Sequence, residues 1–505
     1  MSWWRNRDSL PYALYRRWDR ARYGSPDDPE HEVDVTDLLG GCPVVTVSPR
    51  MTKFSDFFDD AAVSAIRDYD VDVALRFGFR ILKGDALRIA RYGVWSFHHG
   101  DNRVNRGGPP GLWEVMEDAP VTGTILQVLS EELDAGLVLA RSFSSTEPVS
   151  ATANKRTYYW QAAPMLIRTL RALHSRGGAI LDEARGEGDQ WSAYSSRLYV
   201  APKGLEMVRG WARLAGRLLR RRLSVVGVRW QWFLAYRVVR HPGDRRDVPD
   251  GAPHRFRELI PPPDRFWADP IPVAHDGAYL VFFEEYIVGT PHGHICVVEI
   301  AQDGTAGTPR RVLERPYHLS YPFVFRWNDT WYMIPETIGR RTVELYRATG
   351  FPDEWTFDRT LLQDVAAADA TVAEVDGRWW MFTAVAAPNA SEPTLLHVYH
   401  ADSPLGPWEP HAGNPVKFDV RSSRPAGPLF RYRGALYRPA QDGSPVYGSA
   451  VTVLRIDVLT PTTFREVEVS RLTPSWRKGL NGTHTLAAAG GLTVIDARQP
   501  IRVFR

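Results

Sequence analysis

Cysteine is almost absent from this sequence. Its 505 residues contain only two cysteines, Cys42 and Cys296, which lie far apart along the chain. Small secreted domains compensate for a small core with several disulfides, so two distant cysteines exclude a fold of that kind. A chain of this length with 44% hydrophobic residues is instead long enough for two or three domains, each with an apolar core.

An excess of one charge is also absent. The chain has 62 Lys and Arg against 59 Asp and Glu, a formal net charge of +3. This balance argues against a dedicated nucleic-acid binder. One basic cluster has helical spacing, which favours a solvated helix face, or a helix that joins two domains, over a membrane or RNA patch. It consists of Arg217, Arg220, Arg221 and Arg222.

Long apolar runs are missing as well. No uninterrupted stretch of about twenty apolar residues occurs, so we expect no membrane span. The amino terminus is rich in arginine and aromatic residues and reads as a helix. It lacks the apolar segment of a signal peptide. These features predict a cytoplasmic protein.

A metal centre is not expected. His292, His294 and Cys296 alternate in sequence, which would place them on one face of a strand, where they could share a metal. The sequence offers no fourth ligand, and a packed or solvated strand face is the commoner outcome.

The first 149 residues do contain a pattern that carries chemistry. His98 ends an apolar, strand-like stretch, Asp134 follows a second one, and a loop rich in Gly and Pro lies between them. A carboxylate beside an imidazole raises its pKa and fixes its tautomer, so the ring can donate a hydrogen bond to a developing oxyanion. The same carboxylate can accept the proton that an attacking amine loses.

These residues resemble the formyltransferase family, which includes methionyl-tRNA formyltransferase and the sugar N-formyltransferases. The resemblance covers roughly residues 40–145 and implies an α/β domain with a Rossmann-type sheet. That sheet would be truncated here, because its first recognisable strand is residues 42–47. Catalysis would fall to His98 and Asp134, with Ser96 in place of the family's asparagine. The matching motifs are Ser96-Phe97-His98, Arg106-Gly107, Thr122-Gly123 and Leu133-Asp134-Ala135-Gly136.

The resemblance also implies a cofactor, 10-formyltetrahydrofolate, bound along residues 71–82. On the alternative reading, the apolar residues of this stretch simply pack in a core or sheet. The residues that would line the folate slot are Phe77, Gly78, Phe79 and Ile81, and those that would shape the side of the amino-sugar acceptor are Arg106, Gly107 and Gly108.

Residues 150–222 read as helices that connect two halves of the chain. Apolar residues recur three and four apart, with a break expected near Pro164. These helices would cover the amino-terminal sheet. Their basic residues are more typical of a solvated helix face than of a site for an anionic substrate.

From residue 223 to residue 505 the pattern predicts an all-β domain. Helical periodicity disappears, and short aromatic and β-branched runs alternate with Gly, Asp and Pro turns. Five runs recur at roughly fifty-residue spacing, which predicts a five-bladed β-propeller with a central pocket. The runs are AYLVFFEEY, TWYMIPET, RWWMFTAV, ALYRPAQD and LTVIDARQ.

Polar residues stand at the start of each predicted inner strand. Inner strands of a propeller begin near its axis, so these side chains should converge at one end of the channel. They are Asp269, Tyr321, Asp369, Arg424 and His484, which Glu336, Gln441, Asp442 and Asp496 on the next strands could join.

This half resembles the five-bladed glycosidases of the arabinanase and xylosidase type. It also resembles the region that precedes the plant glucosamine inositolphosphorylceramide transferases. Glycosidases need two carboxyl groups across the scissile bond, and Asp269, Asp369 and Glu336 are candidates. Arg424 would suit an anionic sugar or a phosphate. Alternatively, the polar residues close the propeller through hydrogen bonds.

The leading hypothesis is formyl transfer from 10-formyltetrahydrofolate to an amino sugar in glycan or glycolipid biosynthesis, with a propeller that binds or processes the glycan. A second hypothesis makes the propeller the active half, as a glycoside hydrolase or glycosyl-transferring enzyme, and the amino-terminal domain a scaffold. A third is a non-catalytic carbohydrate-binding protein.

Overall fold

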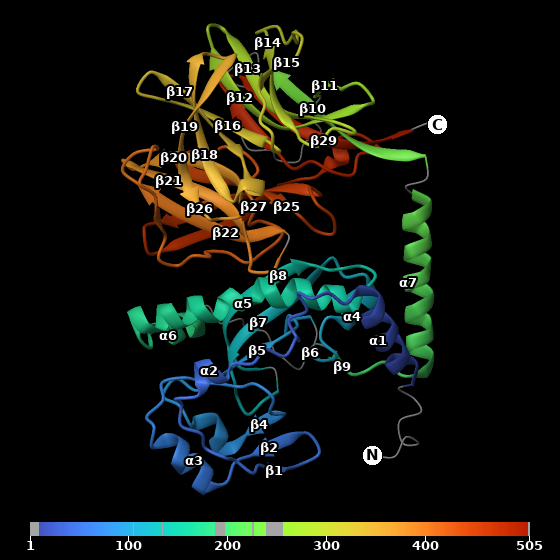
Figure 1. Ribbon diagram of the computed structural model, residues 1–505, viewed down its shortest axis with the longest axis vertical. Coiled ribbons are helices and arrows are strands. Elements are labelled where there is room, and N and C mark those ends of the chain that lie inside the picture. The colour runs from blue at the N-terminus through green and yellow to red at the C-terminus, as the bar shows by residue number, and fades with distance from the viewer. Residues whose placement is uncertain are drawn as a thin grey trace. The chain divides into compact units, whose positions relative to one another are not determined.

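A computed structural model of the chain describes residues 10–104, 106–133, 135–186, 197–224, 227–238, 256–390 and 392–502. The chain divides into two compact units, Met1–Leu218 (unit 1) and Leu219–Arg505 (unit 2). Unit 1 mixes helices and strands, and unit 2 consists almost entirely of strands (Figure 1). No helix within the described ranges is both long and apolar enough to cross a bilayer.

The largest sheet of unit 1 has four strands in the order β3 (Ala74–Leu75), β5 (Val94–His98), β7 (Val121–Val128) and β8 (Leu137–Ser145). Only the β3–β5 pairing is parallel, and the other two are antiparallel. The sheet therefore differs from the expected Rossmann-type arrangement, in which neighbouring strands run parallel. The connection from β7 to β8 is too short for the crossover that a parallel pair needs. A formyltransferase-like α/β fold is not confirmed.

The described part of unit 1 also contains two smaller sheets. One contains β1 (Arg50–Met51), β2 (Ser55–Phe57) and β4 (Ile81–Lys83), and the other pairs β6 (Arg106–Gly107) with β9 (Leu198–Tyr199). The strand expected at residues 42–47 is wrong, because this stretch is irregular and Val44 is 87% exposed. Residues 71–82, expected to bind the folate, contain the two short strands β3 and β4 with a loop between them.

The helices of unit 1 include one long segment, α5 (Ala151–Arg176). It begins at the N-cap Ser150, whose hydroxyl accepts a hydrogen bond from the Ala153 N–H, and it continues through Pro164. The break expected there is wrong. Packing against the sheet, with Gln161 donating to the Phe143 carbonyl of β8, offsets the local cost of the proline. The other helices are α1 (Leu10–Tyr23), α2 (Thr36–Leu39), α3 (Asp60–Arg67), η2 (Gly84–Arg88), α4 (Leu112–Glu117), α6 (Ala179–Gly186) and α7 (Gly204–Ser224).

Three helices of unit 1 share one apolar core. Tyr15 of α1 and Trp113 of α4 lie in the same buried cluster as Met207 of α7. Arg217 of α7 is part of this packing, since it forms an ion pair with Asp118 at 2.7 Å and donates to the Pro148 carbonyl. This member of the predicted basic cluster therefore holds α7 in place and does not lie on a solvated face.

Within the described residues, unit 2 contains five four-stranded antiparallel sheets, arranged as the blades of a propeller. The predicted β-rich half of the fold is confirmed. The first three blades are β12 (Arg265–His275), β13 (Ala278–Ile287), β14 (His294–Ile300), β15 (Arg310–Leu313); β16 (Ser320–Trp327), β17 (Thr330–Glu336), β18 (Thr342–Gly350), β19 (Glu354–Gln363); and β20 (Ala367–Val375), β21 (Arg378–Ala386), β22 (Pro393–Ala401), β23 (Glu409–Pro410).

The ring is closed by a blade made from both ends of unit 2, here called the closing blade. Its strand β10 pairs with β29 along the full 11 residues of each strand. This closure removes the free sheet edges that an open ring would expose. The fourth blade is β24 (Phe430–Tyr432), β25 (Ala435–Asp442), β26 (Ala450–Leu459), β27 (Phe464–Leu472), and the closing blade is β28 (Leu486–Ala489), β29 (Leu492–Arg502), β10 (Val228–Val238), β11 (Arg257–Leu259). The short helices η5 (Ile338–Arg340) and η6 (Pro474–Trp476) lie in connections between strands.

Buried apolar clusters between neighbouring blades form the core of unit 2. Trp267 packs in the cluster between the first blade and the closing blade, and Trp380 in the one between the third and fourth blades. Trp379 packs against the cluster between the second and third blades. Trp267 and Trp380 are buried in blade packing, and Trp379 is partly buried against it, so all three contribute to packing between blades.

Candidate active site

Three inner strands of the propeller carry the same local irregularity. The pairing of the first and second strands shifts register between Ala268 and Ile271, between Ser320 and Phe323, and between Ala368 and Thr371. At each bulge one non-glycine residue has a left-handed backbone: Asp269 (φ 54°), Tyr321 (φ 40°) and Asp369 (φ 55°).

Left-handed backbone is unfavourable for such residues and persists only where the surroundings impose it. A β-bulge redirects the side chain of the residue that it adds. The repeated bulge therefore aims a polar side chain of each of the first three blades toward the axis. The convergence predicted from the sequence is present in the structure.

The first group of axial residues joins the first blade to the closing blade. The His484 imidazole lies between two carboxyl groups, with Nε2 3.2 Å from Asp269 Oδ1 and Nδ1 2.7 Å from Asp496 Oδ2. Asp496 also accepts the backbone N–H groups of His484 and Thr485 at 2.7 and 3.1 Å. The Thr485 hydroxyl donates to Asp269 at 3.1 Å, and the Tyr321 N–H donates to its other oxygen at 3.3 Å.

The second group centres on Arg424 of the fourth blade. Its Nε lies 2.5 Å from Asp369 Oδ2, and its Nη2 donates to Glu336 Oε2 at 3.1 Å. The amide of Gln441 donates to the same Asp369 oxygen at 2.7 Å. Asp442 lies outside this group, because it forms an ion pair with Arg471.

Burial gives the axial acids different protonation behaviour. Burial raises the pKa of Asp269 to about 7, with His484 opposing the shift and Asp369 adding to it. Burial also raises the pKa of Glu336 well above its usual value, in part offset by Arg424. Burial acts on Asp496 too, but the attraction of His484 outweighs it and lowers the pKa of that carboxyl. Groups that hold a proton near neutral pH therefore lie beside groups that do not.

A metal does not fit the axial group as arranged. Ligand atoms of Asp269, His484 and Asp496 lie within 4.8 Å of one another. Both imidazole nitrogens, however, already face carboxylate oxygens. Burial opposes protonation of His484, but its acidic neighbours, Asp496 most of all, outweigh burial and raise its pKa. An imidazolium has no lone pair to offer a metal.

Tyr447, which the sequence did not single out, marks the solvent side of the cluster. Its side chain is 40% exposed. Its ring centroid lies 5.2 Å from that of His484 and 5.2 Å from the Arg424 guanidinium carbon. Tyr447 lies between β25 and β26, outside the predicted inner-strand positions. No periodic signal in the sequence could have indicated it.

The predicted catalytic residues of unit 1 are only partly described. Asp134 lies outside the described residues, so its distance from His98, the last residue of β5, stays untested. Ser96 points its hydroxyl at Arg76, accepting hydrogen bonds from Nε at 3.0 Å and Nη2 at 2.9 Å. Ser96, at the position of the formyltransferases' asparagine, is therefore hydrogen-bonded to the Arg76 guanidinium.

The residues predicted to line a folate slot do not form a continuous strand. Phe77 and Phe79 are 69% and 38% exposed. Gly78 has a φ of +82°, and a Cβ at this position would have no other atom within 4 Å, while Ile81 belongs to β4. The carbonyls of Phe79 and Arg80 accept hydrogen bonds from Arg76 Nη1, so the loop folds around the Arg76 side chain. Phe77 therefore does not pack in a core, whereas Phe79 packs edge-on against Phe58 with ring centroids 5.2 Å apart. A folate slot along these residues stays a prediction.

The predicted acceptor loop is fixed by strand pairing. Arg106 and Gly107 form β6, and the Gly108 N–H donates to the Tyr199 carbonyl at 3.1 Å. A Cβ at Gly107 would lie 2.3 Å from that carbonyl oxygen. The glycine is needed for close approach of two backbones, and a substrate role for these three residues stays a prediction.

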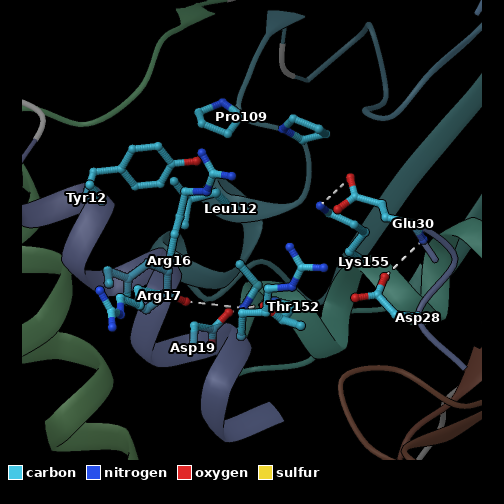
Figure 2. A pocket seen from close by; sticks show the side chains of 15 residues that line it. Tyr12, Arg16, Arg17, Asp19, Asp28, Glu30, Pro109, Leu112, Thr152 and Lys155 are labelled. Atoms are coloured by element: carbon cyan, nitrogen blue, oxygen red, sulfur yellow. Dashed lines mark hydrogen bonds and ion pairs between the residues drawn. The ribbon is translucent and has the colours of Figure 1, made fainter. Parts of the chain in front are cut away.

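Unit 1 also contains a cavity of about 530 Å³ beside α1 and the start of α5 (Figure 2). Arg16, Arg17 and Arg20 line one part of it, and Lys155 forms an ion pair with Glu30 at 2.8 Å in another. Pro109 and Pro110 form part of the wall, whereas Arg106, Gly107 and Gly108 do not line the cavity. Among the described residues, the predicted catalytic residues Ser96 and His98 and the folate-slot residues do not line it either.

Sequence comparison matches residues 259–488 to the family described as "Glucosamine inositolphosphorylceramide transferase 1, N-terminal". The chain is 35% identical over 248 residues to glucosamine inositolphosphorylceramide transferase 1 of Oryza sativa subsp. japonica, covering 46% of this chain and 33% of the relative. The Arabidopsis thaliana protein of the same name is 34% identical over 223 residues, covering 43% and 29%. The chain thus spans about a third of the length of these curated relatives.

Other similarities are weaker. Methionyl-tRNA formyltransferase of Deinococcus radiodurans is 30% identical over 127 residues, covering 24% of this chain and 38% of that protein. Among solved structures, a family 117 glycoside hydrolase from Zobellia galactanivorans has a TM-score of 0.34 at 14% identity, covering 46% of this chain and 85% of its own. A Cellvibrio cellulosa α-L-arabinanase has a TM-score of 0.30 at 10% identity, covering 40% and 77%. The predicted resemblance of the propeller to the amino-terminal domain of the plant transferases is therefore confirmed.

Proposed function

We propose that the propeller acts on the glycosidic bond of a glycan or glycolipid, as a glycosyl-transferring enzyme or glycoside hydrolase. Its active site would be the axial cluster, the two groups of axial residues described above: Asp269, Glu336, Asp369, Arg424, Gln441, His484 and Asp496. The observation that carries this proposal is the pair of bulged carboxyl groups, Asp269 and Asp369, aimed at the axis from the first and third blades. Glycosidic chemistry uses two carboxyl groups in different protonation states.

Asp269 has the properties of a general acid. Because burial raises its pKa to about 7, a large share of this carboxyl is protonated at neutral pH and can donate to the oxygen of a leaving group. Its hydrogen-bond partners, the Thr485 hydroxyl and the Tyr321 N–H, fix its orientation.

Asp369 has the contacts of an ionised carboxylate. It accepts hydrogen bonds from N–H groups of Arg424 and Gln441, which suit a negatively charged acceptor. In this state it can stabilise positive charge at the anomeric carbon, or act as base or nucleophile. Arg424 positions Asp369 and holds Glu336 beside it.

Two features support a substrate with a phosphate-bearing head group. The matched relatives are named for glucosamine and inositolphosphorylceramide, and Arg424 places a guanidinium behind the partly exposed ring of Tyr447. The ring offers a face for a sugar, and the guanidinium favours an anionic neighbour. Under this proposal unit 1 is a scaffold.

The test uses the full chain with a panel of glycolipids, aryl glycosides and nucleotide sugars, and mass spectrometry of the products. We expect Asp369→Asn and Asp269→Asn each to lower turnover about 100-fold or more, while binding of the glycan is retained. Asp376→Asn is the matched control, because Asp376 lies in the same blade as Asp369 but its side chain is 87% exposed. Unchanged turnover in both axial variants would contradict the proposal that Asp269 and Asp369 carry the reaction.

Formyl transfer by unit 1 stays a prediction of the sequence, and so does its cofactor, 10-formyltetrahydrofolate. The similarity to a formyltransferase covers 24% of the chain. Ser96, which would have to assist the reaction, already accepts two hydrogen bonds from Arg76. Incubating the protein and its His98→Ala variant with the folate and nucleotide-linked amino sugars would test this activity separately from the propeller.

A further inference from the structure

A second group of chemically active side chains lies in the first blade, away from the axial cluster. In the pairing of β13 with β14, Glu285 is directly opposite His294. Directly opposed residues of an antiparallel pair share one face, and residues two apart on a strand do so as well. Backbone pairing therefore places the side chains of Glu285, His294 and Cys296 together. His292, expected from the sequence to join this face, precedes β14, and Glu285 takes its place.

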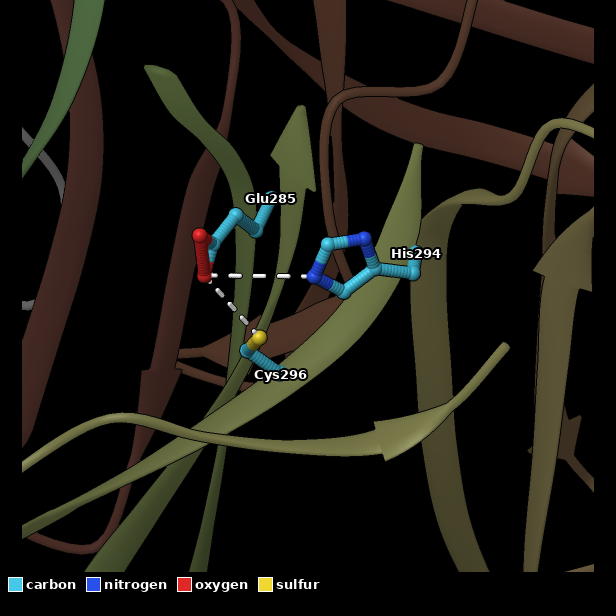
Figure 3. Close-up of side chains that lie close together, drawn as sticks. All are labelled: Glu285, His294 and Cys296. Atoms are coloured by element: carbon cyan, nitrogen blue, oxygen red, sulfur yellow. Dashed lines mark hydrogen bonds and ion pairs between the residues drawn. The ribbon is translucent and has the colours of Figure 1, made fainter. Parts of the chain in front are cut away.

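The three ligand atoms meet at one point (Figure 3). Glu285 Oε1 lies 3.3 Å from Cys296 Sγ and 3.9 Å from His294 Nε2, and all three ligand atoms lie within 4.8 Å of one another. The residues are 6%, 4% and 2% exposed. A tetrahedral zinc ion with bonds of about 2.0–2.3 Å would separate its ligand atoms by roughly 3.3–3.6 Å. Side-chain shifts of about 1 Å or less would bring the three atoms to three corners of such a tetrahedron.

The carboxylate is already oriented as a single-oxygen ligand. Arg265 Nη1 donates to Glu285 Oε2 at 2.6 Å, which leaves Oε1 directed at the thiol and the imidazole. Asp264 holds the guanidinium in turn, accepting from Nε at 3.0 Å and from Nη2 at 3.1 Å. Hydrogen bonds that orient a ligand in this way are typical of protein metal sites.

We propose that Glu285, His294 and Cys296 bind a zinc ion. A thiolate, an imidazole and one carboxylate oxygen are the ligands that zinc prefers, whereas calcium and magnesium take oxygen ligands. On binding, the Cys296 thiol loses its proton to solvent and a sulfur–zinc bond replaces the S–H bond. Glu285 and His294 each donate a lone pair and release no proton. The fourth position remains for a water molecule.

The ion would hold together the adjoining ends of β13 and β14, next to β12, the strand that carries Asp269. Glu285 pairs with Trp267 of β12, two residues before the bulged Asp269, and Cys296 packs in the apolar cluster shared with the closing blade. None of the three ligands belongs to the axial cluster, so the zinc site can be tested independently of the proposed activity.

The first experiment measures metal content. The purified full chain is stripped with a chelator, dialysed against zinc sulfate and then against metal-free buffer, and analysed by inductively coupled plasma mass spectrometry. We expect about one zinc ion per chain, lost in Cys296→Ser and in His294→Gln. Cys42→Ser, the other cysteine and an exposed one, should retain the ion, as should His292→Gln. Zinc-free wild type, or Cys296→Ser with wild-type zinc content, would overturn the proposal.

The second experiment does not depend on a variant that folds. Cobalt bound in place of zinc gives a thiolate-to-metal absorption band in the near ultraviolet only if a cysteine sulfur is a ligand. We expect this band in the wild type and in Cys42→Ser. Its absence from cobalt-loaded wild type would exclude Cys296 as a ligand.

Discussion

At the scale of single residues, backbone conformation decides what each polar side chain can do. The sequence shows that Asp269, Tyr321 and Asp369 begin inner strands, but not that each has a left-handed backbone. Distant carboxylates hold two of these bulges, since Asp496 accepts the Asp269 N–H at 3.2 Å and Asp269 accepts the Tyr321 N–H at 3.3 Å. Because these partners come from distant parts of the chain, no local pattern could have indicated the geometry.

The pKa of Asp269 predicts how activity and stability depend on pH. Since burial raises that pKa to about 7, the proton is bound more tightly in the folded than in the unfolded chain. The stability that this group contributes is therefore complete below about pH 4 and is lost as pH rises through about 7, at about 1.4 kcal/mol per pKa unit. Activity that requires the proton should also decline above pH 7.

Urea unfolding of the wild type and of Asp269→Asn between pH 4 and pH 8 checks this expectation. The wild type should lose stability relative to the variant as pH rises, because the amide does not titrate. Parallel curves for the two proteins would contradict the raised pKa.

Substitution of two glycines, Gly78 and Gly107, distinguishes the cost of backbone strain from the cost of a steric clash. Gly107 and Gly78 have nearly equal φ values, +81° and +82°, but only at Gly107 would a Cβ meet another backbone atom, the Tyr199 oxygen at 2.3 Å. We expect Gly78→Ala to cost about 1 kcal/mol. Gly107→Ala should cost about 3 kcal/mol or more, because β6 must move away from β9. Hydrogen exchange at residues 197–200 measures the difference, and equal exchange in the two variants would contradict it.

At the scale of elements, patterning located strands well where a repeat supported it. The five runs that predicted the propeller are the second strands of its blades, β13, β17, β21, β25 and β29. Where the sequence has no repeat, local pattern predicted two features wrongly, a strand and a helix break. Residues 42–47 have strand composition but no partner strand, and α5 continues through a proline because the sheet supports it. Strands need partners, and only the folded chain provides them.

The fourth blade shows a buried ion cluster that local pattern did not predict. Arg438 of β25 is fully buried and donates to both oxygens of Glu466 of β27, which Lys417 also contacts at 2.7 Å. We expect Glu466→Gln to destabilise the protein by about 3–5 kcal/mol, because it leaves a buried guanidinium without its counter-charge. Chemical unfolding measures this loss.

The matched control for this cluster is an exposed pair. Asp329, which contacts Arg326 at 2.9 Å, has a side chain that is 95% exposed. Asp329→Asn should change stability by less than about 1 kcal/mol. A similar loss in both variants would mean that burial does not determine the strength of the Glu466 pair.

At the scale of the whole molecule, stability of the propeller depends on ring closure. Strand β29 comes from the carboxyl-terminal end of unit 2 and pairs with β10 from its amino-terminal end. Ala497 of β29 is fully buried in the cluster shared with the fourth blade, whereas Ala488 of β28, in the same sheet, is exposed.

A charge at Ala497 should therefore open the ring. We expect Ala497→Glu to cost about 3 kcal/mol or more, since a carboxylate would be buried without a partner, and Ala488→Glu to have little effect. Limited proteolysis and urea unfolding compare the two. If Ala497→Glu is as stable as Ala488→Glu, closure does not limit the stability of the propeller.

The sequence by itself determined that the second half of the chain is a repeated β structure and that polar residues begin its inner strands, because both properties are periodic along the chain. Only the tertiary structure determined which of these acids have raised or lowered pKa values, because the residues that bury them and the charges beside them belong to different blades. The tertiary structure also shows that the Ser96 hydroxyl accepts a hydrogen bond from Arg76. It shows as well that Glu285, and not His292, lies beside Cys296. Contacts between residues far apart in sequence leave no mark in local composition.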